Sequence, residues 1–482
     1  MDFLGLTTLS IITNTTSVCQ SKHKDIEVDI DNIPLNDEKT FDVFRQGHTD
    51  EIFQFESPGM KKYLQQLKPD SINDLIAMNA LYRPGPMKYI DSYIRRKHGI
   101  EPVVYTFPEM EEILKETYGI TVYQEQVMLL SQKLAGFTKG QADELRKAMG
   151  KKKLDVLQKM EQQFFDGCKK NGFDLNKIKQ IWEDWKNFAS YAFNKSHSVC
   201  YALLAYQTAY LKAHYPSEFM CAALNTKSNI EGIASVLSEC RRMGIRILPP
   251  DVNESVEKFN VLPDGSIRFG LSYIKNVGQN FAEELIKNRN EQGKFNVIFE
   301  LADRLPPRVL NKKNIENLAM AGAFDSFKDI HRAMFFVPAA DKLTLTDKLS
   351  KYAESNQKKQ TLGNSLFDTN GSAESLINRY PEILPVPEWD ITTKLLKEKE
   401  VIGLFISGTP LDDYKLITKS VKHINIRDLN IGLNENIKEF QNKSLTLMGW
   451  AAQVEQRITK TGKNYYTLEI GRPYRQYQFV YT

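Results

Sequence analysis

The spacing of apolar residues divides the chain into helical and strand-forming stretches. In the first half, apolar residues recur three and four positions apart, as in residues 156–170 and 200–215, which predicts amphipathic helices. The pattern then changes to alternation in residues 259–274, where Asp264 and Gly265 give a turn signal between two short strands. We therefore expect a multidomain α+β protein whose first half is mainly helical.

The last third of the chain changes pattern twice. Residues 343–398 are polar and poorly periodic, which is typical of a mobile linker. From Ser444 to Thr482, polar and apolar positions alternate on both sides of a turn sequence at residues 460–463. About three strands of ordinary length fit there, so we expect a small sheet with an open edge.

Composition narrows the class of protein. The chain has 482 residues with 64 Lys and Arg against 60 Asp and Glu, a net charge of +4. About three domains fit this length. The five cysteines lie far apart without a CxxC pair, which favours neither a zinc site nor a disulfide framework. No apolar run reaches the length of a membrane span and no signal pattern opens the chain, so we expect a cytoplasmic protein that does not bind a membrane.

One short segment gathers side chains that bind anions. Asn194, Lys195, Ser196 and His197 follow one another between aromatic residues. Lysine provides a mobile positive charge for phosphate, Asn and Ser provide neutral hydrogen bonds, and histidine donates to phosphate oxygens or moves a proton. These four residues are candidates for binding one polyanionic ligand. A polar loop that opens a helix is the alternative interpretation.

Two upstream segments carry similar chemistry. Arg83 stands in the rigid turn Tyr-Arg-Pro-Gly-Pro, and residues 139–153 hold six basic and two acidic side chains, a local charge of +4. The end of this cluster, with Lys151 and Lys152, also suits a solvated helix C-terminus, where cations favour the helix dipole. Arg146 and Lys147 lie beside apolar neighbours, where a charge needs a partner, and we expect that partner to be phosphate.

The order of these blocks resembles the bacterial replicative DNA polymerase III alpha subunit, a C-family DNA polymerase. The resemblance rests on many collinear segments over nearly the whole chain, among them DFLGL, FQFES, LIAMNALYRPGP, YGITVYQEQVM, LAGFTKGQADELRKAMGKK, YAFNKSHSVCY and MGIRILPPDVN. It implies that this is a partial chain without the N-terminal phosphoesterase-like domain and without most of a polymerase-beta-like palm.

The resemblance also implies a domain order. We expect the C-terminal remnant of the palm with its last strand, the fingers that close over the incoming nucleotide, a helix-hairpin-helix domain of the clamp-binding type, a linker with a clamp-binding peptide, and a connecting segment with a partial OB-fold barrel. The corresponding ranges are 1–50, 51–230, 231–342, 343–398 and 399–482.

Catalysis in this family needs two Mg²⁺ ions held by palm aspartates. Asp2 matches the third of these aspartates, so the resemblance makes it the catalytic and metal-binding residue of this chain. One carboxylate does not fix two ions, and the acidic run with Asp25, Asp29 and Asp31 falls where the family has an ordinary connection. We therefore expect a separate palm-containing segment as a partner.

Two further contacts follow from the resemblance. Lys275, Asn276 and Gly278 fall in a helix-hairpin-helix hairpin that binds a DNA phosphate, with Asn276 in place of the usual glycine. Leu366 and Phe367 fall where relatives carry a peptide that binds the sliding clamp, although its leading glutamine is absent.

Two functions remain open from the sequence. In the first, the chain is the fingers-to-C-terminal part of a polymerase that adds dNTPs to a primer 3′-hydroxyl on a DNA template. In the second, it is a non-catalytic fragment that binds DNA and tethers it to the sliding clamp. The chain retains the blocks that the resemblance assigns to triphosphate binding. This favours the first function, because a tether does not need to bind nucleotides.

Overall fold

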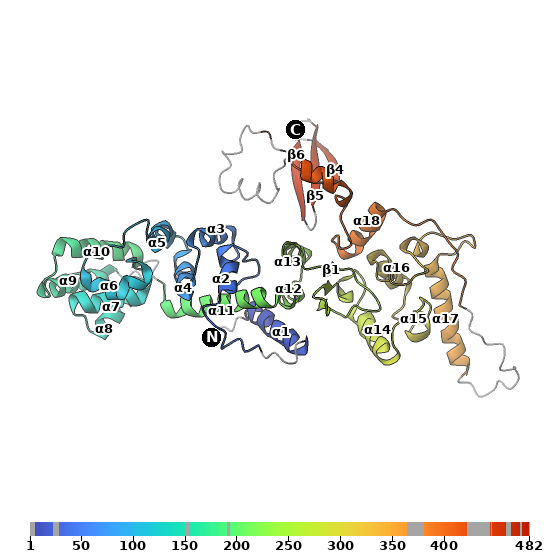
Figure 1. The fold of residues 1–482 in the computed structure, drawn as a ribbon, viewed down its shortest axis with the longest axis horizontal. Helices are drawn as coiled ribbons and strands as arrows, with labels where there is room; N and C mark the ends of the chain where they lie inside the picture. The colour runs from blue at the N-terminus through green and yellow to red at the C-terminus, as the bar shows by residue number, and fades with distance from the viewer. Residues whose placement is uncertain are drawn as a thin grey trace. The chain divides into compact units, whose positions relative to one another are not determined.

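Helices make up most of the computed structural model of this chain (Figure 1). The structure describes residues 5–22, 28–150, 154–189, 193–363, 380–421, 444, 446–458, 464–472 and 475–481. The chain divides into two compact units, Met1–Tyr215 and Pro216–Thr482. Among the described residues, no helix is both long and apolar enough to cross a bilayer.

The first unit is built from helices. Its α-helices are α1 (Thr7–Lys22), α2 (Glu38–Arg45), α3 (Pro58–Leu67), α4 (Ile72–Leu81), α5 (Ile90–Lys97), α6 (Glu111–Leu114), α7 (Gln124–Ala135), α8 (Lys139–Gly150), α9 (Leu154–Lys170), α10 (Leu175–Ala189) and α11 (Lys195–His214). Three short 3₁₀ helices connect them: η1 (Pro86–Tyr89), η2 (Pro108–Met110) and η3 (Lys115–Thr117). The helix α11 packs on α1, α2 and α4, so the end of the unit returns to its beginning.

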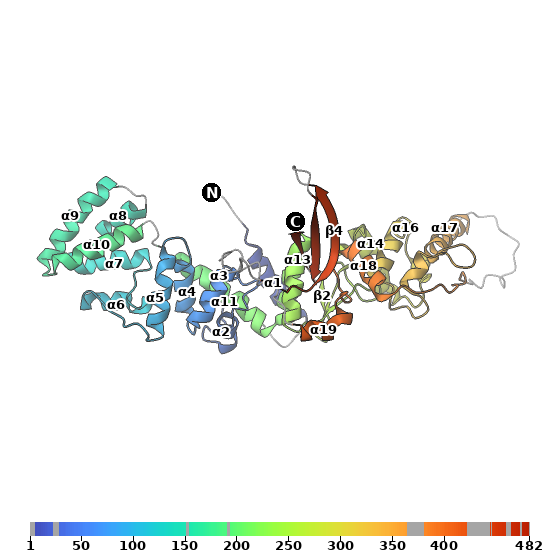
Figure 2. The same ribbon diagram turned by 90° about the horizontal axis from the view of Figure 1, so that it is seen from above.

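An aromatic core holds α7 to α10 together (Figures 1 and 2). Trp182 of α10 is fully buried and stacks on Phe164 of α9 with 5.1 Å between ring centroids. Trp185 lies 5.1 Å from the same phenylalanine ring. The apolar spacing predicted for residues 156–170 is therefore confirmed as the buried face of α9.

Gly167 of α9 allows a close approach to the end of α7. A Cβ atom there would lie 2.2 Å from the carbonyl oxygen of Ala135. We expect Gly167→Ala to lower the free energy of unfolding by about 1–3 kcal/mol, because crowding outweighs alanine's helix preference. Gly140→Ala in α8, which meets only Thr138 Oγ1 at 3.9 Å, is the matched control and should not destabilise. Urea unfolding followed by tryptophan fluorescence distinguishes the two, and equal midpoints would contradict the crowding argument.

The palm strand expected in residues 1–50 is absent from the described part of that range. Residues 5–22 and 28–50 contain α1 and α2 and no strand. Helix α1 buries Ile11, Ile12 and Cys19 and packs on α11. The expectation of a strand was wrong for these residues because it came from the resemblance of the DFLGL block, whereas the residues after it bury a helical face.

The second unit combines helices with two small sheets. Its α-helices are α12 (Pro216–Asn225), α13 (Ile230–Arg242), α14 (Gln279–Gln292), α15 (Glu300–Arg304), α16 (Lys312–Ala321), α17 (Leu345–Gly363), α18 (Ile391–Ile402) and α19 (Lys415–Ser420). The 3₁₀ helices are η4 (Leu271–Tyr273), η5 (Arg332–Phe335) and η6 (Asp412–Tyr414). The strands are β1 (Ile247–Leu248), β2 (Asn260–Val261), β3 (Ile267–Arg268), β4 (Trp450–Ile458), β5 (Asn464–Arg472) and β6 (Arg475–Tyr481).

The hairpin predicted in residues 259–274 is confirmed. Strands β2 and β3 pair antiparallel, and β1 pairs parallel with β3. Gly265 takes a left-handed φ of 80°, which glycine adopts without strain, and Asp264 accepts hydrogen bonds from the backbone and hydroxyl of Ser266.

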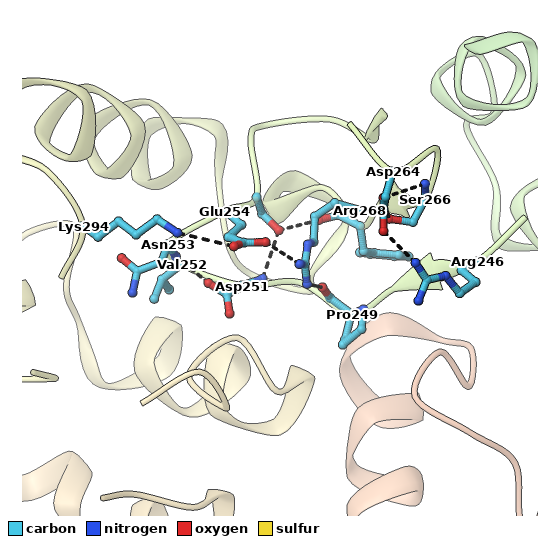
Figure 3. A network of polar contacts seen from close by, with 12 residues as sticks. Arg246, Pro249, Asp251, Val252, Asn253, Glu254, Asp264, Ser266, Arg268 and Lys294 are labelled. Carbon is cyan, nitrogen blue, oxygen red and sulfur yellow. Dashed lines mark hydrogen bonds and ion pairs between the residues drawn. The ribbon is translucent and has the colours of Figure 1, made fainter. Parts of the chain in front are cut away.

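Polar contacts tie this hairpin to the turn that follows β1 (Figure 3). Arg268 donates to the carbonyl oxygen of Pro249 at 3.0 Å and to Glu254 at 2.5 Å, and Glu254 lies 3.4 Å from Lys294. Arg246 pairs with Asp264 at 2.6 Å on the other side of the hairpin. The Pro-Pro-Asp-Val-Asn block thus has a structural role in this unit.

The linker predicted for residues 343–398 is wrong at both ends, which form α17 and the first part of α18. Leu345, Leu349 and Ala353 are buried at spacings of four, so one narrow apolar stripe fixes an otherwise polar helix. Tyr352 of α17 and Tyr380 both donate to Asp303, which anchors the described residues on either side of 364–379. Residues 364–379 lie outside the described residues.

The strands predicted near the C-terminus are confirmed. In the described residues, β4, β5 and β6 form an antiparallel sheet in that order, open at both edges and not closed into a barrel. Val454 lies opposite Leu468, and Leu468 lies opposite Phe479. Apolar positions on three strands therefore share one face of the sheet.

Candidate functional site

The start of α11 is organised by Asn194. Its side chain caps the helix by accepting a hydrogen bond from the backbone N–H of His197 at 2.8 Å. Its amide nitrogen donates to Glu125 at 2.9 Å, and the other oxygen of Glu125 accepts from the backbone N–H of Lys195 at 2.9 Å. Since Glu125 stands in the first turn of α7, one carboxylate joins the beginnings of two helices.

The backbone supports the same junction. Tyr123 and Phe193 form a parallel β-bridge, and the N–H of Gln124 donates to the carbonyl oxygen of Phe193 at 2.9 Å. The segments YQEQ and FNKSHS, which are far apart in sequence, are therefore adjacent in the fold.

The charged end of Lys195 is paired within the protein. Its Nζ lies 2.8 and 2.7 Å from the two carboxylate oxygens of Glu116 in η3 and 5.5 Å from the ring centroid of Tyr123. The Lys195 and Glu116 side chains are 34% and 33% exposed. The pair is therefore within reach of solvent and of a dissolved ligand.

His197 and Ser196 are both exposed at the start of α11. The His197 ring meets Phe193 edge-on at 5.1 Å and lies 4.1 Å from the Tyr201 ring, which in turn lies 5.0 Å from Phe53. Phe193 and Tyr201 thus pack the fold around the histidine and fix its position.

Arg83 reaches the same cluster from the turn after α4. Its guanidinium lies 3.7 Å from the Phe193 ring centroid and donates to the carbonyl oxygen of Ala80 at 2.8 Å. Burial lowers the pKa of this guanidinium from its ordinary value. The predicted rigid turn is confirmed, with Gly85 at a φ of 105°. The structure therefore brings Arg83 together with residues 194–197.

Arg146 and Lys147 have a protein partner. Arg146 donates to Asp143 at 2.8 Å, and Lys147 Nζ lies 2.7 Å from the other oxygen of the same carboxylate. Hydrogen bonds from Lys147 and Arg146 lower the pKa of Asp143 below its ordinary value. The premise that these cations lack a partner in the chain was wrong, because an acid one turn earlier on α8 pairs with both. The contacts that hold the start of α11 do not include them.

The hairpin before α14 has the backbone that its sequence suggested. Asn276 takes a left-handed φ of 62°, as expected of the residue in place of a glycine. Gly278 is the N-cap of α14, and the side chains of Lys275 and Asn276 are exposed. The N–H of Lys275 donates to Val401 at 2.9 Å and its carbonyl oxygen accepts from Asn317 at 2.6 Å, which fixes the loop from both sides.

A cleft of about 810 Å³ opens beside this hairpin. Asn276 and Gly278 line one side, and Lys287, Arg308 and Asn311 also border it. Sequence reasoning missed Lys287 and Arg308, although both fall within residues 231–342, the range expected for the helix-hairpin-helix domain. Two cations beside a helix N-terminus suit an anionic ligand, with Glu283 and Glu284 limiting the net charge.

Several predicted site residues lie outside the described residues: Asp2, Lys151, Lys152, Leu366 and Phe367. Asp29 is described, and its carboxylate accepts from the backbone of Asp31 and from Asn32 within its own turn. Over the part of the chain that the structure describes, no three His, Cys, Asp or Glu side chains gather as metal ligands would.

Comparison with known proteins gives this geometry a context. Residues 8–172 match the family described as "Bacterial DNA polymerase III alpha subunit finger domain", and residues 244–334 match "Helix-hairpin-helix motif". DNA polymerase III subunit alpha of Aquifex aeolicus is 40% identical over 465 residues, which cover 96% of this chain and 37% of that protein.

Two further relatives carry the same name. The protein of Treponema pallidum is 40% identical over 466 residues, with 96% of this chain and 38% of the relative covered. That of Escherichia coli K12 is 38% identical over 475 residues, with 96% and 39% covered. The chain thus spans less than two fifths of the length of these relatives. It belongs to the bacterial DNA polymerase III alpha subunit family and corresponds to the region with the finger domain and the helix-hairpin-helix motif.

Proposed function

We propose that this chain supplies the fingers and DNA-binding part of a DNA-directed DNA polymerase in bacterial replication, active in the cytoplasm. The reaction is in-line attack of a primer 3′-hydroxyl on the α-phosphate of a dNTP, with release of pyrophosphate. The observation that supports it is the grouping of Asn194, Lys195, Ser196 and His197 at one helix start, with Arg83 on the ring of the adjoining Phe193.

Side chains, more than backbone, would hold the triphosphate here. The backbone N–H groups of Lys195, His197 and Ser198 already donate to Glu125 or Asn194. The Lys195 ammonium and the exposed Ser196 and His197 side chains then provide the donors for phosphate oxygens. They act by positioning the nucleotide and by offsetting charge that develops in the transition state.

Arg146 and Lys147 contribute to phosphate binding in this proposal, and Lys151 and Lys152 contribute to DNA binding. For α8 to bind phosphate, the ligand must compete with Asp143 for both cations. Arg146 is the better candidate, because its guanidinium offers donors beyond the two that Asp143 engages.

The Mg²⁺ ions of the reaction remain an expectation from family membership. The described residues do not gather the carboxylates that a two-ion site needs, and Asp2 lies outside them. In this proposal, therefore, none of the described residues is assigned as a metal ligand. A palm-containing partner segment, which supplies the remaining aspartates, belongs to the proposal.

Primer-template DNA would bind at the hairpin before α14. Lys275, Asn276 and Gly278 present an exposed helix start, and Arg308 stands across the adjoining cleft. Backbone N–H groups at such a start bind phosphate without reading sequence. The β4–β6 sheet is proposed as part of an OB fold, and Leu366 with Phe367 as a clamp-binding peptide.

Gly278→Ala tests the hairpin directly. The residue has an ordinary φ of −77°, and a Cβ there meets no atom within 4 Å, so the variant should fold normally. If a DNA phosphate approaches this backbone, the methyl group should weaken duplex binding about tenfold, roughly the worth of one charge-assisted hydrogen bond. Fluorescence anisotropy with a labelled duplex measures this. Gly140→Ala is the control, and unchanged affinity in both variants would remove the hairpin from the interface.

Primer extension distinguishes the polymerase from the non-catalytic tether. The assay contains Mg²⁺ and all four nucleotides, with the chain alone and with a palm-containing polypeptide. Extension that depends on this chain, and is lost in Asp2→Ala, supports the proposal. If the chain binds DNA in a salt-sensitive way but no primer is extended under either condition, the alternative function is supported: a non-catalytic fragment that binds DNA and tethers it to the sliding clamp.

A further inference from the structure

The cation best placed for phosphate is already occupied by an anion of the protein. Both oxygens of Glu116 contact Lys195 Nζ, at 2.8 and 2.7 Å, from a position 79 residues earlier in the chain. Glu116 belongs to η3, whereas Lys195 opens α11, so the pair joins two separate elements. The positive charge is thus offset in this state.

A phosphate ligand should be able to replace Glu116 in the ion pair with Lys195. A carboxylate presents two oxygens to an ammonium much as a phosphate does, and an ammonium with two of its three N–H groups engaged cannot serve both fully. About a third of each side chain is exposed, and ion pairs of that kind contribute little net stability. A multiply charged ligand should therefore displace Glu116 at small cost.

The displaced carboxylate has an alternative environment. Glu116 borders a cleft of about 830 Å³ that is also lined by Lys115, Gln132 and Lys133. Lys133 itself lies 3.1 Å from Glu112, an exposed pair that is easily rearranged. A turn of the Glu116 side chain into this cleft would keep its charge near Lys115 and Lys133, with Glu112 as the other acid in the lining.

Glu125 differs from Glu116 in what it holds. Its oxygens accept from the Lys195 backbone and the Asn194 amide, both of which define the helix start. Releasing it would leave the junction of α7 and α11 with only the backbone bridge between Tyr123 or Gln124 and Phe193 as its described polar link. Glu125 is therefore a positioning residue that should stay in place when ligand binds.

We propose that Glu116 is an internal competitor for the triphosphate: it occupies Lys195 in the empty state and yields it to the incoming nucleotide. The inference rests on the proposed function, because Lys195 must be a phosphate contact. Its consequence is that removing the Glu116 charge strengthens ligand binding more than removing another acidic charge from the same cleft does.

The experiment is calorimetric titration of the whole chain with sodium tripolyphosphate and, separately, with dATP. Glu116→Gln should lower Kd about three- to fivefold for both ligands. Glu112→Gln is the matched control, because it removes the same charge from the same cleft but contacts Lys133. Lys195→Gln should raise Kd about tenfold, and adding Glu116→Gln to that variant should change nothing further.

The outcomes separate the two claims. If Lys195→Gln weakens binding but Glu116→Gln and Glu112→Gln have equal effects, Glu116 is not a competitor for the triphosphate. Lys195 remains a phosphate contact in that case. If Lys195→Gln leaves binding unchanged, or if no variant binds either ligand, both fail. Tighter binding in Glu116→Gln that persists without Lys195 would show a general charge effect and overturn the proposal.

Discussion

Replacing Lys195 with alanine is expected to slow nucleotide addition about 100-fold when the chain is assayed with a palm-containing partner. In the proposed site this ammonium offsets charge that grows on the triphosphate as the leaving group departs. Loss of one such donor in an enzyme typically costs a factor of about 10²–10³ in rate. Rapid-quench measurement of single-nucleotide addition gives the rate directly.

The fold should survive this substitution. Lys195 Nζ contacts Glu116 and lies over Tyr123 at 5.5 Å, and its side chain is one-third exposed. Its backbone N–H, which alanine retains, makes the structural contact with Glu125. Lys159→Ala on the exposed face of α9 is the control and should extend primers at the normal rate. A normal rate in Lys195→Ala would exclude this lysine from the chemistry.

Local features of this site could be predicted from the sequence. The alternative interpretation of residues 194–197, a polar loop that opens a helix, describes how α11 begins, and Asn194 is the N-cap. Asn276 in place of a glycine indicated a left-handed backbone, and its φ of 62° confirms it. Both predictions concern conformational preferences of single residues, which depend little on the rest of the fold.

Partners of the site residues were harder to identify, and for different reasons. Glu116 and Glu125 are 79 and 70 residues from Lys195, so only the tertiary fold, which brings η3 and the first turn of α7 to the start of α11, places them there. Asp143 was within reach of sequence reasoning, because it precedes Arg146 and Lys147 by three and four positions on a predicted helix. A charge on a helix face has to be checked against its neighbours one turn away before a ligand is invoked.

Helix α17 shows a limit of periodicity arguments. Its polar composition hid a stripe of three buried apolar residues, Leu345, Leu349 and Ala353, beside which the polar Thr346 and Lys348 are also buried. Compositional polarity is a poor guide when a helix buries one narrow face, because most of its residues remain in solvent. The same reasoning explains why the first part of the predicted linker was wrong.

The largest loss of stability is expected for Glu398→Ala in α18. This carboxylate is fully buried and accepts hydrogen bonds from the backbone N–H and hydroxyl of Ser407 and from the N–H of Ile406. Arg332, itself 6% exposed, lies 3.6 Å away. Alanine would leave the N–H of buried Ile406 and the N–H of exposed Ser407 without their acceptor, and it would reduce the compensation of the buried Arg332 guanidinium. Breaking such a network typically costs about 3–5 kcal/mol.

Hydrogen exchange followed by mass spectrometry suits this test, because a chain with two compact units need not unfold in one step. Peptides that cover α18 and residues 403–407 should lose protection in Glu398→Ala, while peptides from α7 to α10 keep theirs. Glu400→Ala is the control, since that residue is 55% exposed on the same helix and pairs only with Lys397 among its described contacts. Equal protection in the two variants would mean that solvent or a rearranged side chain replaces the buried carboxylate, and that burial of Glu398 adds specificity to the fold without adding stability.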